Sequence, residues 1–126
     1  GLIGVRGASD GEQITTLDNQ ERTLVAGDGV IVDESDRAIG IAGVMGGAST
    51  EISSSTTGVL LELASWNPES IARTSQRLGL RSEASARFER GTDWGINPLA
   101  VERSCSESSQ LLPSYHHLSE EWFTIW

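Results

Sequence analysis

The stretch Val59-Leu60-Leu61-Glu62-Leu63-Ala64 is the part of the chain that decides the fold. Its apolar residues surround one carboxylate, with the polar run 53–57 upstream and Asn67-Pro68 downstream. A continuous apolar run of this length between turn signals is typical of a strand buried on both faces. Burial penalises a charged carboxylate, so we expect Glu62 either to reach water at a sheet end or to meet a polar partner.

Two helices are predicted to follow this strand. Asn67-Pro68 supplies a capping residue and a proline for the first helical position, and Gly79 is a typical C-terminal stop, which predicts a helix over residues 68–78. Ser82 caps a second helical stretch over residues 82–90. The helical period gives the first helix an apolar face and a basic face, formed by Ile71, Ser75 and Leu78 and by Arg73 and Arg77.

The first 42 residues have β patterns. Residues 13–17 and 22–25 are expected to form a hairpin across the turn signal Asp18-Asn19. Further strands are predicted in the apolar runs 2–5, 30–32 and 38–42, with an acidic loop tip at 33–36. The fold class is therefore α/β in the mixed α+β sense: a β-rich N-terminal half with a mixed sheet, and helices in the C-terminal half.

The motif Gly43-Val44-Met45-Gly46-Gly47 has two interpretations. Glycines allow backbone N–H groups to approach a small ligand closely, and they equally allow a tight turn between strands. The motif is not a phosphate loop, because the lysine and the glycine spacing are absent.

Charge limits the partners that the chain can bind. The net charge of -9 argues against a general nucleic-acid surface, DNA included, because such a surface needs cations. Residues 1–62 carry ten acids and three arginines, whereas residues 63–126 carry eight acids and six arginines. Five of these six arginines lie between Arg73 and Arg90, so the candidates for RNA contact are Arg73, Arg77 and Arg81. A solvated helix face with a Glu69–Arg73 pair is the alternative.

The composition indicates a single cytoplasmic domain. The 126 residues contain one cysteine, Cys105, which forms no internal disulfide and lacks companions for a metal cluster. Neither a leader nor a long apolar segment is present in this sequence, so we expect no membrane partner.

Five short motifs point to one family. In chain order they are Gly11-Glu12, Thr16-Leu17-Asp18, the stretch Ile41 to Gly47, Leu60-Leu61-Glu62, and Ser82-Glu83-Ala84-Ser85 with Arg87-Phe88-Glu89-Arg90-Gly91-Thr92-Asp93. Their order and spacing resemble the editing domain of the bacterial phenylalanyl-tRNA synthetase beta subunit. The resemblance covers roughly Val5 to Arg103.

The resemblance implies a site for tyrosine. In this family, the position of Gly46 lines the amino-acid pocket and that of Glu62 accepts a hydrogen bond from the tyrosine phenol. Ser82 stands where the family often has threonine, and the small Ala84 leaves room for the aromatic ring. The implied reaction is hydrolysis of mischarged tyrosyl-tRNA(Phe), because a hydrophobic synthetic pocket rejects an added hydroxyl poorly and a second sieve is needed. The chain offers no Ser-His-Asp set, so we expect a water molecule positioned by Gly46 and Ser82.

The resemblance also implies partners. The family's whole enzyme joins phenylalanine to its tRNA with ATP and magnesium at a site on the alpha subunit, whereas this chain needs no cofactor or metal of its own. The expected partners are the acceptor end of tRNA(Phe) and, through the rest of the beta subunit, the alpha subunit. The alternatives are a non-catalytic amino-acid- or tRNA-binding structural module and, third, a deacylase acting in trans.

Two departures from the family set the expected boundaries. The family's domain begins earlier, with a histidine motif that has no counterpart here, so we interpret residues 1–103 as a partial editing domain. Residues 104–126 are interpreted as an atypical tail, in which His116-His117 lacks the further ligands that a metal would need.

Overall fold

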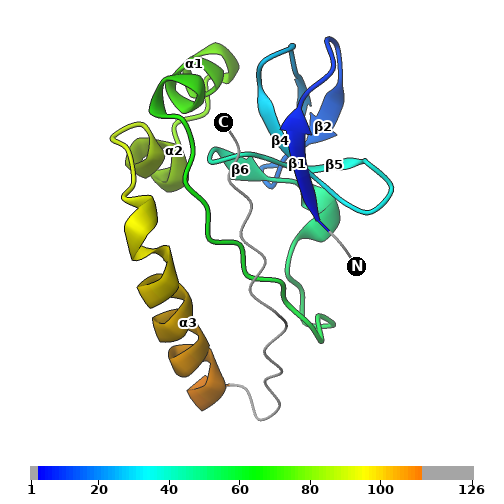
Figure 1. Cartoon of the computed structure of the whole chain (residues 1–126). Coiled ribbons are helices and arrows are strands. Elements are labelled where there is room, and N and C mark those ends of the chain that lie inside the picture. Colours follow the sequence, from blue (N-terminus) through cyan, green and yellow to red (C-terminus); the bar gives the residue numbers. More distant parts are fainter. Residues whose placement is uncertain (1–2, 112–126) are drawn as a thin grey trace.

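Short antiparallel strands make up the first 46 residues, and helices follow from residue 68 (Figure 1). This computed structural model describes residues 3–111. One sheet has the order β1-β4-β5-β6 and a separate hairpin pairs β2 with β3. The strands are β1 (Gly4–Gly7), β2 (Gln13–Thr15), β3 (Glu21–Thr23), β4 (Gly29–Val32), β5 (Ala38–Ile41) and β6 (Met45–Gly46).

The mixed α+β class is confirmed, and so is the hairpin. Asn19 adopts a left-handed φ of 58° at the turn between β2 and β3, a conformation that asparagine tolerates better than most residues. The pairings in the described sheets are antiparallel, whereas we expected a mixed sheet. Short loops join β4 to β5 and β5 to β6, and loops of this length allow antiparallel pairing without a crossover.

The core lies between the strands and the first helix. Leu24, Val30 and Val44 are the largest fully buried apolar side chains, and Ile71 from the helix packs into the same cluster. Burying these groups is the main favourable contribution to folding.

Helix α1 (Pro68–Leu78) has the predicted bounds because its ends are encoded locally. The Asn67 side chain accepts hydrogen bonds from the amides of Glu69 and Ser70, at 3.0 and 3.1 Å, and Gly79 ends the helix with a left-handed φ of 65°. The buried face is Ile71, Thr74 and Ser75.

The remaining described elements are three short ones, the 3₁₀ turns η1 (Ala48–Thr50) and η2 (Trp94–Ile96) and the helix α2 (Glu83–Phe88), and one long helix, α3 (Asn97–Leu111). The predicted cap of α2 is confirmed, because Ser82 and Ser85 form a reciprocal capping box. Helix α3 continues through residue 103 to Leu111. The predicted boundary at 103/104 stays a prediction, and residues 112–126, with His116-His117, lie outside the described residues.

The predicted buried strand over residues 59–64 is wrong for this structure. Residues 51–67 form no helix or strand, and Val59, Leu60 and Leu61 are 64%, 63% and 56% exposed. The physical reason is that no neighbouring strand within residues 3–111 pairs with this segment, and an apolar run becomes a strand only where a partner satisfies its backbone. The segment instead runs extended towards α1 (Figure 1).

Candidate functional site

The glycine motif lies where the sheet meets the helices α1 and α2. Gly43 has a φ of 66°, and a Cβ there would lie 2.8 Å from both Trp66 Cδ1 and Ile71 Cδ1. A Cβ at Gly47 would lie 2.6 Å from the Ile39 carbonyl oxygen. These two glycines therefore permit close packing against α1 and β5, as the tight-turn interpretation expects.

Part of the motif's backbone is already hydrogen-bonded. The Val44 amide donates to the Ile41 carbonyl at 3.0 Å, and the Gly47 amide donates to the Ile39 carbonyl at 2.8 Å. Gly46 is exposed, and its carbonyl accepts from the Leu17 amide at 3.0 Å. A ligand approaching this motif would therefore meet the exposed surface of Gly46 rather than a row of free N–H groups.

Ser82 connects the glycine motif to α2. Its hydroxyl donates a short hydrogen bond to the Val44 carbonyl and accepts one from the Ser85 amide at 3.0 Å. Two of the predicted site positions, Gly46 and Ser82, are therefore held in neighbouring parts of the structure by one side chain. The hydroxyl that we expected to position water also holds the fold together here.

Glu62 and Ala84 complete the predicted set, and both are exposed. Desolvation raises the pKa of the Glu62 carboxyl group, because nearby protein atoms displace part of its water although the residue still touches solvent. Within residues 3–111 the carboxylate makes no ion pair or hydrogen bond, so it is a free acceptor. No hydrogen bond or ion pair among the described residues joins Glu62 to Gly46, Ser82 or Ala84.

A small hollow lies elsewhere, between β1, the turn before β4 and the start of α1. It has a volume of about 200 Å³, and its lining includes Arg6, Asp28, Trp66 and Thr74. The Trp66 indole N–H is buried and has no hydrogen-bond partner in the described part of the chain. None of the predicted site residues lines this hollow.

Asp28 is a buried carboxylate whose importance the sequence analysis missed. Its oxygens accept hydrogen bonds from the Thr74 hydroxyl at 2.7 Å, the Val25 amide at 2.9 Å and the Arg77 guanidinium. Thr74 and Arg77 are three residues apart on α1, a spacing that places both on one face of a helix. The sequence offered a signal for this network: a threonine and an arginine at helical spacing, together with an acid between two glycines.

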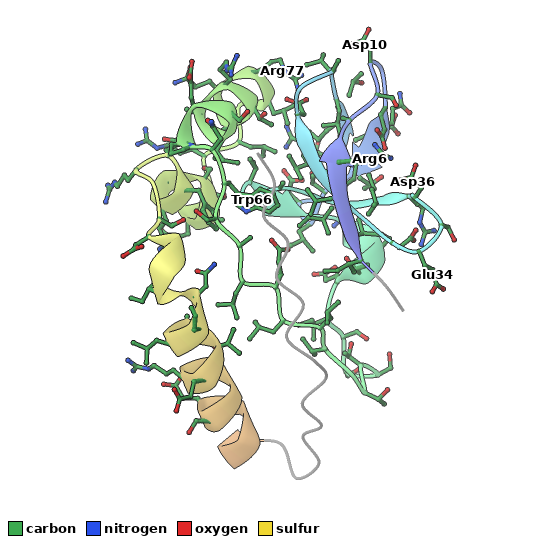
Figure 2. All side chains as sticks on the ribbon, in the orientation of Figure 1. Arg6, Asp10, Glu34, Asp36, Trp66 and Arg77 are labelled. Carbon is green, nitrogen blue, oxygen red and sulfur yellow. The ribbon has the colours of Figure 1, made fainter. Side chains whose placement is uncertain are left out.

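The Arg77 side chain therefore stabilises the fold, because its guanidinium is bound to Asp28. It also donates to the Thr23 carbonyl at 3.2 Å, and it lies between α1 and the strands (Figure 2). Arg22 makes a contact in the opposite direction, from β3 to the end of α1, by donating to the Leu78 carbonyl at 3.0 Å. Of the three RNA-contact candidates, Arg73 and Arg81 are exposed and have no ion-pair partner within the described residues. Arg90 has the same properties, and the sequence analysis did not select it.

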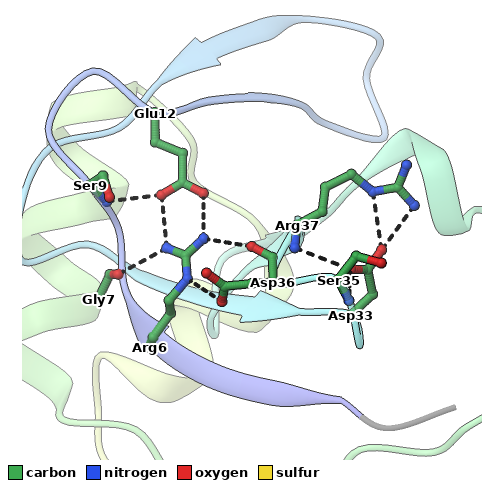
Figure 3. A network of polar contacts seen from close by, with 8 residues as sticks. All are labelled: Arg6, Gly7, Ser9, Glu12, Asp33, Ser35, Asp36 and Arg37. Carbon is green, nitrogen blue, oxygen red and sulfur yellow. Dashed lines mark hydrogen bonds and ion pairs between the residues drawn. The ribbon is translucent and has the colours of Figure 1, made fainter.

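The three arginines of residues 1–62 are paired with acids. Arg6 lies between Glu12 and Asp36, with contacts of 2.8 Å to each, and Arg37 pairs with Asp33 (Figure 3). Hydrogen bonds from Arg6 hold the pKa of Glu12 below its usual value. Arg22 pairs with Asp18 at 2.6 Å. This half of the chain therefore offers no unpaired arginine to a phosphate backbone.

Two classes of site receive no support from the described residues. No cluster of three or more His, Cys, Asp or Glu side chains within residues 3–111 could hold a metal ion. No helix in that range is both long enough and apolar enough to cross a membrane.

A mixed α+β domain built around this glycine motif and the Ser82 cap defines the class of protein: the chain belongs to the B3/4 domain family, which matches residues 1–112. Its relatives include proteins named phenylalanine–tRNA ligase beta subunit. The one from Geobacter sulfurreducens is 50% identical over 109 residues, 86% of this chain and 14% of the relative. Those from Nocardia farcinica and Leifsonia xyli are 52% and 53% identical, over 84% and 88% of this chain and 12% and 13% of the relatives. The chain thus spans a small fraction of the length of these relatives.

Proposed function

We propose that this chain is part of an editing module in the beta subunit of a phenylalanine–tRNA ligase. The module would recognise tyrosine attached to tRNA(Phe) and hydrolyse the ester. The observation that carries the proposal is Glu62, a carboxylate without a partner among the described residues, with a pKa raised by desolvation. Its position matches the family's acceptor for the tyrosine phenol, and membership of the B3/4 family supports the assignment.

Discrimination would rest on the phenol hydrogen bond. A tyrosine phenol donates to the Glu62 carboxylate, whereas phenylalanine has no donor and leaves the acceptor without a partner. Such a difference grows as the acceptor loses water, because a desolvated acceptor without a partner costs about 1–3 kcal/mol. The raised pKa of Glu62 supports a carboxylate that has already lost part of its hydration.

Hydrolysis would use a positioned water molecule. Gly46 and Ser82 lie on connected elements, since the Ser82 hydroxyl contacts the Val44 carbonyl. A hydroxyl oxygen can accept a further hydrogen bond beside the one from Ser85, so Ser82 retains capacity to orient water. Ala84, two residues after Ser82 in the first turn of α2, is small and exposed, which supports room for an aromatic ring.

The remaining roles belong to the whole enzyme. We infer that aminoacylation, with its ATP and magnesium, takes place on other parts of a larger assembly that includes an alpha subunit. Arg73 and Arg81 are the proposed contacts to the acceptor end of tRNA(Phe), because both are exposed and without an ion pair in the described region. Translation would place the protein in the cytoplasm.

The competing function is a non-catalytic structural module. Two observations favour it: the Ser82 hydroxyl already serves the fold, and Arg77 is bound to Asp28. In this case the chain would keep the B3/4 fold and bind amino acid or tRNA without turnover.

A titration separates the two functions. Amide NMR spectra of the labelled chain are recorded with tyrosine and with phenylalanine, and release of tyrosine from tyrosyl-tRNA(Phe) is followed in parallel. The editing proposal expects shifts in residues 43–47 and 82–85 with tyrosine only, and ester release above the rate without protein. Glu62→Ala should remove the preference for tyrosine, whereas the matched control Glu51→Ala, in the same exposed stretch, should keep it.

Equal responses to both amino acids, or a tyrosine preference that survives Glu62→Ala, would contradict the proposed recognition. Tyrosine-specific shifts without ester release would favour the non-catalytic module.

A further inference from the structure

Ser85 is a fully buried hydroxyl residue in the first turn of α2. Its exposed fraction is 0%, whereas Ser82, the cap of the same helix, is partly exposed. A capping box ordinarily has glutamate or glutamine at the third helical position, which Ser85 occupies here. A fully buried position favours a short side chain, and serine keeps a polar group there.

Three hydrogen bonds join Ser85 to Ser82. The Ser85 hydroxyl accepts from the Ser82 amide at 3.0 Å and donates to the Ser82 carbonyl at 3.1 Å. The Ser85 amide donates to the Ser82 hydroxyl at 3.0 Å. One residue therefore fixes both the backbone and the side-chain oxygen of Ser82.

Ser75 on α1 supports Ser85 in turn. The Ser75 hydroxyl is buried, lies 3.4 Å from the Ser85 hydroxyl and donates to the Leu80 carbonyl at 2.6 Å. Buried hydroxyls that contact one another keep their orientation, because leaving either without a partner costs free energy. The contacts thus run from α1 to Ser85, and then through Ser82 to the Val44 carbonyl of the glycine motif.

We propose that Ser85 is a positioning residue, which fixes the direction of the Ser82 hydroxyl at the editing site. A serine hydroxyl has one hydrogen and two lone pairs. The hydrogen of the Ser82 hydroxyl goes to the Val44 carbonyl and one lone pair accepts from the Ser85 amide, so one lone pair remains to bind water. The fixed direction follows from these contacts, whereas its effect on hydrolysis rests on the proposed function.

The direction of this lone pair decides how water meets the ester. A water molecule that donates one hydrogen to the Ser82 oxygen keeps its own lone pairs for the ester carbonyl carbon. Attack forms the bond between the water oxygen and that carbon, and the bond from the carbon to the ribose oxygen breaks. One proton of the water ends on the ribose oxygen, and the other stays with the carboxyl group of the released tyrosine. A rotating Ser82 hydroxyl would orient water less often, which lowers kcat rather than raising KM.

Hydrolysis kinetics of the 126-residue chain with tyrosyl-tRNA(Phe) test the proposal. Ser85→Ala should lower kcat for tyrosine release by about 10-fold or more and keep KM within about 2-fold, because orientation rather than binding is lost. The matched control Thr74→Val also removes a buried hydroxyl, but one that binds Asp28, and should keep both constants within about 2-fold. Ser85→Cys retains a weak polar group of similar size, so it should recover part of kcat and serves if Ser85→Ala fails to fold.

A double-mutant cycle shows whether Ser85 acts through Ser82. In the Ser82→Ala background, Ser85→Ala should change kcat by less than about 2-fold, because no hydroxyl is left to position. A residue with a separate role would lower kcat by the same factor in both backgrounds.

The carbonyl carbon resonance of Val44 tests the fixed hydroxyl without any hydrolysis. Its chemical shift depends on the hydrogen bond that the Val44 carbonyl accepts from Ser82. We expect Ser85→Ala to move this resonance towards its position in Ser82→Ala, and Thr74→Val to leave it in place.

Three results would overturn the proposal: a Val44 resonance that Ser85→Ala does not move, an unchanged kcat in Ser85→Ala, or an equal loss of kcat in both backgrounds of the cycle. Failure of the unsubstituted chain to release tyrosine would refute the proposed function instead. The Val44 resonance would then still decide whether Ser85 fixes the Ser82 hydroxyl.

Discussion

The sheet with α1 and the segment of residues 51–66 have similarly apolar sequences but opposite environments. Val30-Ile31-Val32 forms β4 between two partner strands, and Val30 is fully buried. Val59-Leu60-Leu61 is equally apolar, and its side chains are more than half exposed. The difference shows that apolar content predicts a need for burial, whereas the presence of neighbouring strands decides whether burial takes place.

The same two regions also differ in their polar contacts. Asp28, Thr74 and Arg77 join the turn before β4 to α1 across a sequence separation of about fifty residues, and Arg22 adds a contact from the hairpin. Residues 57–64 take part in no ion pair or hydrogen bond among the described residues. The first region should therefore respond strongly to substitution, and the second weakly in this chain.

The largest difference in stability is expected between two variants that each replace one leucine, one in each region. Leu24→Ala removes a side chain that is 0% exposed and should lower the free energy of unfolding by about 4 kcal/mol. Leu61→Ala should change it by less than about 0.5 kcal/mol, because Leu61 is 56% exposed. Urea unfolding followed by circular dichroism measures both. A similar loss for the two variants would mean that Leu61 is buried in solution.

Replacement of a buried acid, Asp28, should have the second-largest effect on the free energy of unfolding. Asp28→Ala leaves the Thr74 hydroxyl, the Val25 amide and the Arg77 guanidinium without their acceptor, and should lower the free energy of unfolding by about 3 kcal/mol. Asp10→Ala, at an exposed loop position (Figure 2), is the matched control and should stay within about 0.5 kcal/mol. The same urea experiment compares the two, and an Asp28→Ala variant as stable as the control would rule out this network as the connection between α1 and the sheet.

The smallest effect depends on pH. The pKa of Glu12 is lowered mainly by its hydrogen bonds with Arg6, against the opposing effect of desolvation. A depressed acid stabilises the fold above its unfolded pKa, ordinarily about 4.3, and this contribution is lost as the pH falls through the folded pKa. Glu12→Gln should therefore reduce stability by about 1 kcal/mol at neutral pH, as expected for a partly exposed ion pair.

Thermal unfolding between neutral and acidic pH checks this sign. The wild-type and Glu12→Gln curves should converge at the acidic end, because protonated Glu12 and glutamine are both uncharged. A constant gap at all pH values would show that the effect of Glu12 is packing rather than charge.

The residues of the proposed site differ in how far sequence could place them. Ser82 was expected as a cap and a site residue, and the cap is confirmed. Its hydrogen bond to the Val44 carbonyl was not predictable, because it joins residues 38 positions apart. Glu62 was predicted within a buried strand, and it lies instead in an exposed segment with a raised pKa. Arg77 was a candidate for RNA contact until the fold placed Asp28 beside it.

The sequence by itself determined the features with short-range causes. The Asn67 cap, Pro68 and Gly79 define α1, and Asn19 defines the hairpin turn, because each acts on backbone within four residues of itself. Only the tertiary structure decided which apolar runs are buried and which charges are paired. Those outcomes depend on partners distant in sequence: Asp28 pairs with Arg77 from α1, whereas residues 58–64 pair with no strand within the described chain.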